Sequence, residues 1–160
     1  MIHLRKEWRE FVAAKLDLHT SVLVTVLRGL AMQPYPPEVA SLDFELFPDG
    51  FTEGFPARAF FVDSENTEVF VEENGRFRYP GTVDPELLDI AHIYSADEEE
   101  AFLDREGAME IEDELWELAT TVFFDWFERC WIDAGGSDFP LRATIMPHDD
   151  PGSGRTLPSR

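Results

Sequence analysis

Apolar residues recur every three or four positions in the first part of the chain, which is the spacing of one helix face. Between residues 4 and 16 they are Leu4, Trp8, Phe11, Val12 and Leu16. The pattern predicts an amphipathic helix over 4–16. Residues 20–32 are rich in β-branched side chains and suit a buried strand as well as a helix. Because Gly29 alone interrupts this run, we favour a helix there.

An alternation of apolar and polar residues then replaces the helical spacing and indicates strands. It is clearest in 42–46, where acidic residues separate the apolar ones. Asn74–Gly75 separates two later β-like runs, and this dipeptide favours a tight hairpin turn. We expect an antiparallel meander of about four strands, with Phe77 and Tyr79 facing the core. The expected strands are 42–46, 57–63, 67–72 and 76–79.

Helical signals return after residue 83. Asp84–Pro85–Glu86 combines a capping residue with a proline, which is typical of a helix start. Ser95 and Glu98 have the spacing of a capping box. A long amphipathic helix is expected over 110–134, because Gly135–Gly136 then ends it.

The order of these elements defines a fold class. A last strand is expected over 141–146, and the proline- and glycine-rich residues 149–160 are expected to form a flexible tail. The predicted fold is α+β: N-terminal helices, the antiparallel meander, acidic helices that include the long one, and a final strand. Helices would pack on one face of the sheet. A chain of 160 residues suits a single domain, here 1–148.

Two aromatic residues break the pattern of the long helix. At about 100° per residue, most apolar side chains of this helix share one half of its circumference. Phe124 and Trp131 lie among the acidic residues of the other half. Another segment of the chain could cover them. Alternatively, they could anchor a recognition patch, since exposed aromatic residues are enriched at interfaces. The patch would comprise Phe124, Trp131, Asp113, Glu114, Glu117 and Glu128.

The net charge is strongly negative and unevenly distributed. There are 33 acidic and 13 basic residues, giving a formal charge of −20. This argues against binding of nucleic acid or an anionic membrane, because both require positive charge. Fourteen acidic residues lie between Asp84 and Glu117, where Arg105 is the one basic residue. Residues 4–16, in contrast, are mildly basic.

Two interpretations of this charge remain open at the level of sequence. The acidic residues could simply keep helix faces solvated. They could also steer a basic partner to the surface, which accelerates association. Small acidic inhibitors of basic nucleases and immunity proteins of toxin systems use the same physics. We therefore expect a non-enzymatic protein of that inhibitor or immunity type, which binds a basic protein and needs no cofactor.

The alternative is a metal-dependent hydrolase. His148, Asp149 and Asp150 could ligate a metal or act as acid and base, and His92 could join them through folding. A catalytic metal site generally needs three convergent protein ligands. Sequence does not show convergence, and a solvated turn explains the same residues.

The single cysteine, Cys130, excludes an internal disulfide. It lies on the apolar side of the long helix, so we expect a buried, unreactive thiol. A free thiol, together with an N-terminus in which charge interrupts any apolar run, predicts a cytoplasmic protein.

Overall fold

The computed structural model describes residues 1–78 and 87–160. It begins with two helices, α1 (Ile2–Asp17) and α2 (Thr20–Met32). Both lie where the sequence predicts helices. In α2 the leucines at 23, 27 and 30 are buried. Their spacing of three and four places them on one side, so the helical pattern prevails over the β-branched composition.

The main sheet has four strands in the order β2-β1-β5-β6. The strands are β1 (Ser41–Leu46), β2 (Ala57–Val62), β5 (Arg142–Pro147) and β6 (Arg155–Leu157). β1 is antiparallel to β2, but it is parallel to β5, with Phe44 opposite Ile145. The predicted antiparallel pairing of the first two strands is present, but the final strand lies parallel to β1, so the sheet is mixed rather than strictly antiparallel. The helices between β2 and β5 in the sequence provide the crossover that parallel strands require.

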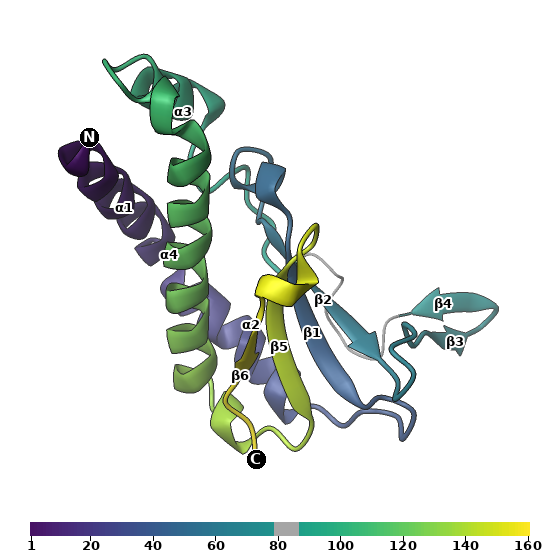
Figure 1. Ribbon diagram of the computed structural model, residues 1–160. Coiled ribbons are helices and arrows are strands. Elements are labelled where there is room, and N and C mark those ends of the chain that lie inside the picture. Colours follow the sequence, from purple (N-terminus) through teal and green to yellow (C-terminus); the bar gives the residue numbers. More distant parts are fainter. Residues whose placement is uncertain (79–86) are drawn as a thin grey trace.

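A separate hairpin comprises β3 (Val71–Glu73) and β4 (Arg76–Arg78). Asn74 and Gly75 have positive φ angles of 54° and 76°, so the predicted turn is confirmed. In Figure 1 this hairpin projects away from the main sheet. The expected positions of the Phe77 and Tyr79 side chains and the expected helix start at 84–86 lie outside what the structure describes.

The acidic segment forms α3 (Ala96–Leu103) and α4 (Glu112–Asp133). α3 begins with the predicted capping box: the Ser95 hydroxyl accepts from the Glu98 amide at 3.1 Å, and the Glu98 carboxylate accepts from the Ser95 amide at 2.9 Å. A short 3₁₀ turn, Met109–Ile111, leads into α4. Gly135 follows α4 with a φ of 89°, the left-handed conformation common after helix ends.

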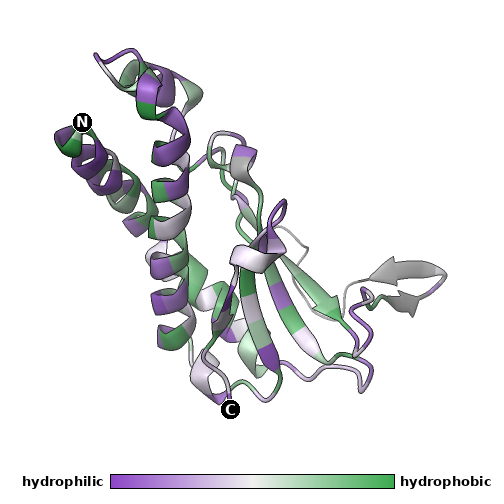
Figure 2. Ribbon diagram, in the orientation of Figure 1, coloured by the Kyte–Doolittle hydropathy of each residue, from purple (hydrophilic) through white to green (hydrophobic). Residues whose placement is uncertain are grey.

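α4 is the centre of the molecule, and α1, α2 and the sheet pack around it (Figure 1). The indole N–H of Trp8 in α1 donates to the carbonyl of Leu115 at 2.7 Å, and that of Trp126 donates to the Thr20 hydroxyl in α2 at 2.9 Å. On the sheet side, the rings of Phe127 and Phe44 meet edge to face at 4.8 Å. The fold is α+β. Figure 2 shows hydrophobic residues concentrated along the strands and the facing side of the helices.

The last residues are part of the sheet. β6 pairs antiparallel with β5, Leu157 is buried, and the Arg160 amide donates to the carbonyl of Phe139 at 2.9 Å. Two further 3₁₀ turns, Gly136–Asp138 and Pro151–Ser153, flank β5. The expected flexible tail over 149–160 is therefore wrong. The composition of the last residues did not indicate that Leu157 is buried against the sheet.

Candidate functional site

Phe124 and Trp131 lie beneath the C-terminal strand. Their exposed fractions are 4% and 0%. The indole N–H of Trp131 donates to the carbonyl of Pro158 at 2.7 Å, and the Arg155 guanidinium lies 5.4 Å from the centre of the Phe124 ring. Of the two alternatives for these residues, cover by another segment of the chain is confirmed, and the exposed recognition patch is wrong.

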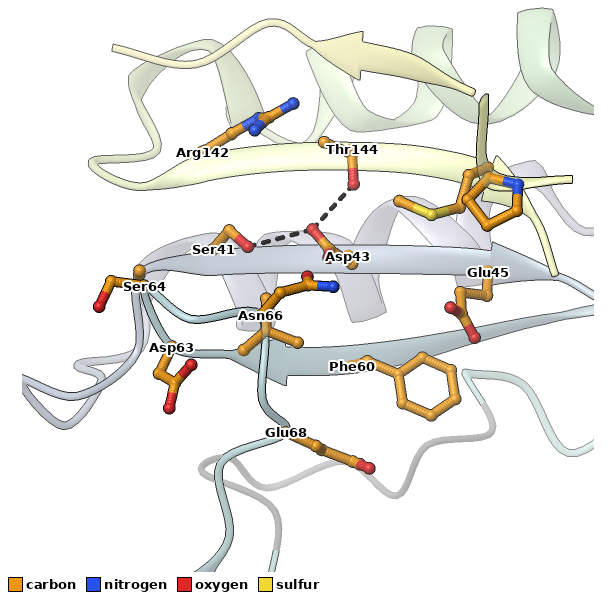
Figure 3. Close-up of a pocket in the computed structure, with 14 residues that line it drawn as sticks. Ser41, Asp43, Glu45, Phe60, Asp63, Ser64, Asn66, Glu68, Arg142 and Thr144 are labelled. Atoms are coloured by element: carbon orange, nitrogen blue, oxygen red, sulfur yellow. Dashed lines mark hydrogen bonds between the residues drawn. The ribbon is translucent and has the colours of Figure 1, made fainter. Parts of the chain in front are cut away.

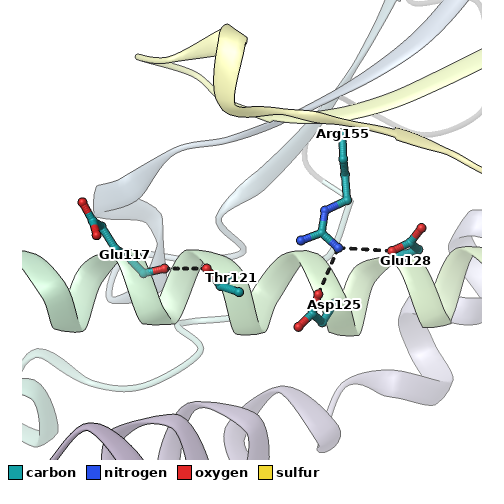
Figure 4. Close-up of polar contacts among 5 residues, drawn as sticks. All are labelled: Glu117, Thr121, Asp125, Glu128 and Arg155. Atoms are coloured by element: carbon teal, nitrogen blue, oxygen red, sulfur yellow. Dashed lines mark hydrogen bonds and ion pairs between the residues drawn. The ribbon is translucent and has the colours of Figure 1, made fainter.

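Arg155 of β6 forms ion pairs with the acidic face of α4. Its Nη1 lies 2.9 Å from Asp125 Oδ1 and 3.2 Å from Glu128 Oε2 (Figure 4). One guanidinium thus contacts an aromatic ring and two carboxylates. Glu128, which was predicted to meet a partner, is engaged within the chain.

The other acidic residues of the predicted patch differ among themselves. Glu114 accepts hydrogen bonds from Arg5 of α1, the shorter at 2.6 Å. Asp113 and Glu117 are exposed on α4. Contact of Asp113 or Glu117 with a partner stays a prediction.

His148 lies at the end of β5 beside β1. Its Nδ1 is 3.2 Å from Glu45 Oε2, and its ring stacks on Phe47 at 4.4 Å. Asp150 accepts a hydrogen bond from the hydroxyl of Ser153. Across residues 1–78 and 87–160, no three His, Cys, Asp or Glu residues are grouped so that they could hold a metal ion.

His92 is coupled to a different part of the molecule. Burial lowers the pKa of His19, at the start of α2, and the charge of His92 lowers it further. The charge of His92 therefore acts on His19, at the α1–α2 junction. Nothing in the described part of the structure groups His92 with His148 as metal ligands.

Cys130 is buried in α4, as expected. Burial, together with the carboxylate of Asp133, raises the pKa of its thiol to about 11. At neutral pH the thiolate is scarce, so this side chain acts as a small apolar residue.

Trp116 is the aromatic residue of α4 that does reach the surface. Its exposed fraction is 47%, whereas Trp8, Trp126 and Trp131 are each at most 2% exposed. It lines a groove of about 650 Å³, called here the Trp116 groove. The walls of this groove include Phe55, Pro56 and Ile90. A large aromatic side chain is thus presented beside apolar surface.

A smaller hollow adjoins this groove and is called here the acidic pocket. Its volume is about 220 Å³, and it is lined by Asp49, Phe51, Thr52, Glu53, Glu99 and Trp116. Asp49, Glu53 and Trp116 also line the groove. Carboxylates from the turn after β1 and from α3 therefore surround the Trp116 side chain.

The pKa of Glu99 reports the electrostatics of the acidic pocket. Burial raises this pKa, and the neighbouring carboxylates of Glu112 and Asp49 raise it further. A hydrogen bond from Trp116 opposes the shift. The carboxylates therefore repel one another, and a cation placed among them would relieve that repulsion.

Sequence reasoning missed Trp116. At about 100° per residue it falls within about 20° of Phe123 and Phe127, which are buried. Angle alone therefore assigns Trp116 to the core. The available signal was its place in the first turns of α4, directly after the densest acidic residues.

A second hollow, of about 720 Å³, lies on the polar face of the sheet (Figure 3). Asp43 at its centre accepts hydrogen bonds from Ser41 at 3.1 Å and Thr144 at 2.8 Å. Glu45 and Arg142 also line it. Because the Asp43 carboxylate already binds two hydroxyl groups of the sheet, its contacts are explained by strand pairing.

Comparison of the chain with protein-family models, curated proteins and solved structures gave no match. In the described ranges, no helix has both the length and the apolar character needed to cross a membrane.

Proposed function

We propose that this protein is a non-enzymatic binder of a basic macromolecule, of the inhibitor or immunity type, and that its recognition surface is centred on Trp116. The partner would be a basic protein such as a nuclease or toxin. One observation carries the proposal: a half-exposed tryptophan lies in a groove beside Asp49, Glu53 and Glu99. An aromatic anchor rimmed by charge is typical of a protein interface.

The charge distribution supports a basic partner. Some acidic side chains are neutralised by α1, since Lys15 Nζ lies 2.5 Å from Glu98 and Arg5 lies 2.6 Å from Glu114. The carboxylates of the acidic pocket are not among these pairs. Of the residues that the structure describes, no basic one lines the pocket, and Arg58 lines the adjoining groove. The field of the pocket carboxylates would attract a cationic surface and accelerate its association.

The proposal is tested with a charge-matched pair of triple variants. The groove variant carries Asp49→Asn, Glu53→Gln and Glu99→Gln. The control carries Glu38→Gln, Glu65→Gln and Asp138→Asn, which are exposed residues outside the groove and the pocket. Both triples remove the same net charge, so a difference between them reports location.

Wild-type and variant proteins are immobilised, and extract from the source cells is applied at low and at physiological salt. We expect wild-type protein and the control to retain a common basic protein that the groove variant releases. Retention should weaken with salt, because screening reduces attraction between exposed charges. Equal retention by all three proteins, or no retained protein at either salt concentration, contradicts the proposal.

A further inference from the structure

The acidic pocket is small. Its volume of about 220 Å³ lies below the roughly 300–1,000 Å³ of clefts that hold drug-sized ligands. A hollow of this size suits a single side chain. The adjoining groove, at about 650 Å³, has room for the segment that carries that side chain.

The lining of the pocket specifies the chemistry of that side chain. Trp116 supplies an aromatic ring, and Asp49, Glu53 and Glu99 supply carboxylates. No basic residue is among the lining residues in the described part of the chain. A cation that also stacks on a ring would match both components.

The chain already contains this combination once, with its cation in place. The Arg155 guanidinium lies 5.4 Å from the centre of the Phe124 ring while Nη1 contacts Asp125 and Glu128. An aromatic ring and two carboxylates thus hold one guanidinium on the C-terminal half of α4 (Figure 4 shows its polar contacts). The acidic pocket repeats the ring and the carboxylates at the other end of the same helix.

We infer that the acidic pocket receives an arginine side chain of the basic partner, with the guanidinium against Trp116 and its N–H groups directed to the carboxylates. Arginine fits better than lysine, because the guanidinium is planar, stacks on aromatic faces, is weakly hydrated and donates in a fixed fork. The inference rests on the proposed function and specifies the partner residue that the surface selects.

The test compares three labelled tetrapeptides by fluorescence anisotropy: tetra-arginine, tetra-lysine and the uncharged tetra-citrulline. Citrulline keeps the planar shape of arginine without its charge. We expect wild-type protein to bind tetra-arginine more tightly than tetra-lysine, and to bind tetra-citrulline least. The groove variant should lose both cationic peptides, whereas the charge-matched control should keep them.

The contribution of the ring is isolated with Trp116→Leu and Trp116→Phe. Both lose the indole N–H, but Phe alone keeps an aromatic face. Trp116→Leu should weaken tetra-arginine binding roughly fivefold to tenfold, as expected for loss of a cation–π contact, and Trp116→Phe should restore part of it. Thermal melting verifies that these exposed substitutions leave the fold intact.

The outcomes separate the two proposals. If tetra-arginine and tetra-lysine bind equally and Trp116→Leu changes neither, the arginine inference is overturned while the acidic surface stands. If the groove variant and the charge-matched control bind both peptides alike, the location of the proposed surface is overturned as well. Absence of binding to wild-type protein contradicts both.

Discussion

At the scale of single residues, burial distinguishes three tryptophans of the core from Trp116, the residue proposed to contact a partner. The indole N–H groups of Trp8, Trp126 and Trp131 each have an acceptor on another element, and all three rings are buried. Gly136 permits this at Trp131, because a β-carbon on Gly136 would overlap the ring. Trp116 instead has a half-exposed ring that lines a pocket together with the Glu99 carboxylate. It is the tryptophan whose replacement should alter binding more than stability.

Two adjacent carboxylates provide a test of the local electrostatics. A hydrogen bond from Lys15 lowers the pKa of Glu98, and bonds from Ser95 contribute to the shift. Burial and neighbouring carboxylates raise the pKa of Glu99. Glu98→Gln should therefore lower the free energy of unfolding at pH 7, whereas Glu99→Gln should raise it. The loss at Glu98 should fall within roughly 0.2–1 kcal/mol, the range of exposed ion pairs.

The pH dependence of the two variants follows from the signs of these shifts. The stabilisation from Glu98 is complete above the unfolded-state pKa of about 4.3 and disappears as pH falls through its lowered folded-state pKa. The destabilisation from Glu99 grows as pH rises from the unfolded-state pKa through the raised folded-state pKa. Urea unfolding between pH 3 and pH 8 measures both. Because the variants have equal net charge, shifts of the same sign would contradict this account.

Residue-scale sequence reasoning succeeded where local chemistry decides the outcome. The capping box at Ser95 and the turn at Asn74–Gly75 depend on neighbours in the chain, and both were predicted. Trp116 was not singled out from the sequence. The environment of Phe124 stayed open, because helical angle gives the direction of a side chain but not the segment that covers it. That information depends on where β6 lies.

At the scale of elements, β6 determines whether Phe124 and Trp131 of α4 are buried. β6 has three residues, yet Leu157 is buried and Arg155 and Pro158 close over Phe124 and Trp131. The helices could be predicted from the sequence because their periodicity is internal to each segment. The parallel pairing of β1 with β5 could not, since alternation defines the faces of a strand but not its neighbours. The same limit concealed β6.

Replacement of Leu157 tests this role of β6. Leu157→Ala should lower the free energy of unfolding by about 2–4 kcal/mol, because it removes buried methyl groups and leaves a cavity. The control is Thr156→Ala on the same strand, since Thr156 is exposed. Denaturant unfolding measures the change, and increased binding of an apolar dye would report exposure of the aromatic residues beneath. Equal effects of the two substitutions would indicate that β6 adds little to the core.

At the scale of the whole molecule, the charge of −20 is partly balanced by the packing of α1 against the acidic helices. Arg5 and Lys15 of α1 pair with Glu114 and Glu98, and Arg105 pairs with Glu7. These two basic residues of the first helix are therefore used in ion pairs within the protein. The negative field that remains is available at the surface, and at the acidic pocket it coincides with an exposed aromatic ring.

Fluorescence quenching of Trp116 measures that field without a partner, because the other three tryptophans are buried. A negative surface potential concentrates cations and repels anions within about one Debye length. When each quenching constant is divided by that of the same ion for free N-acetyltryptophanamide, the ratio for caesium should exceed the ratio for iodide by at least about twofold. Added salt should reduce this difference, and Trp116→Phe should remove the quenchable component.

The groove variant should lose more of the difference than the charge-matched control, because the nearest charges dominate a screened potential. Equal losses in the two triple variants would show that the field at Trp116 arises from the net charge of the molecule, so that the acidic pocket would have no local advantage in attracting a cation.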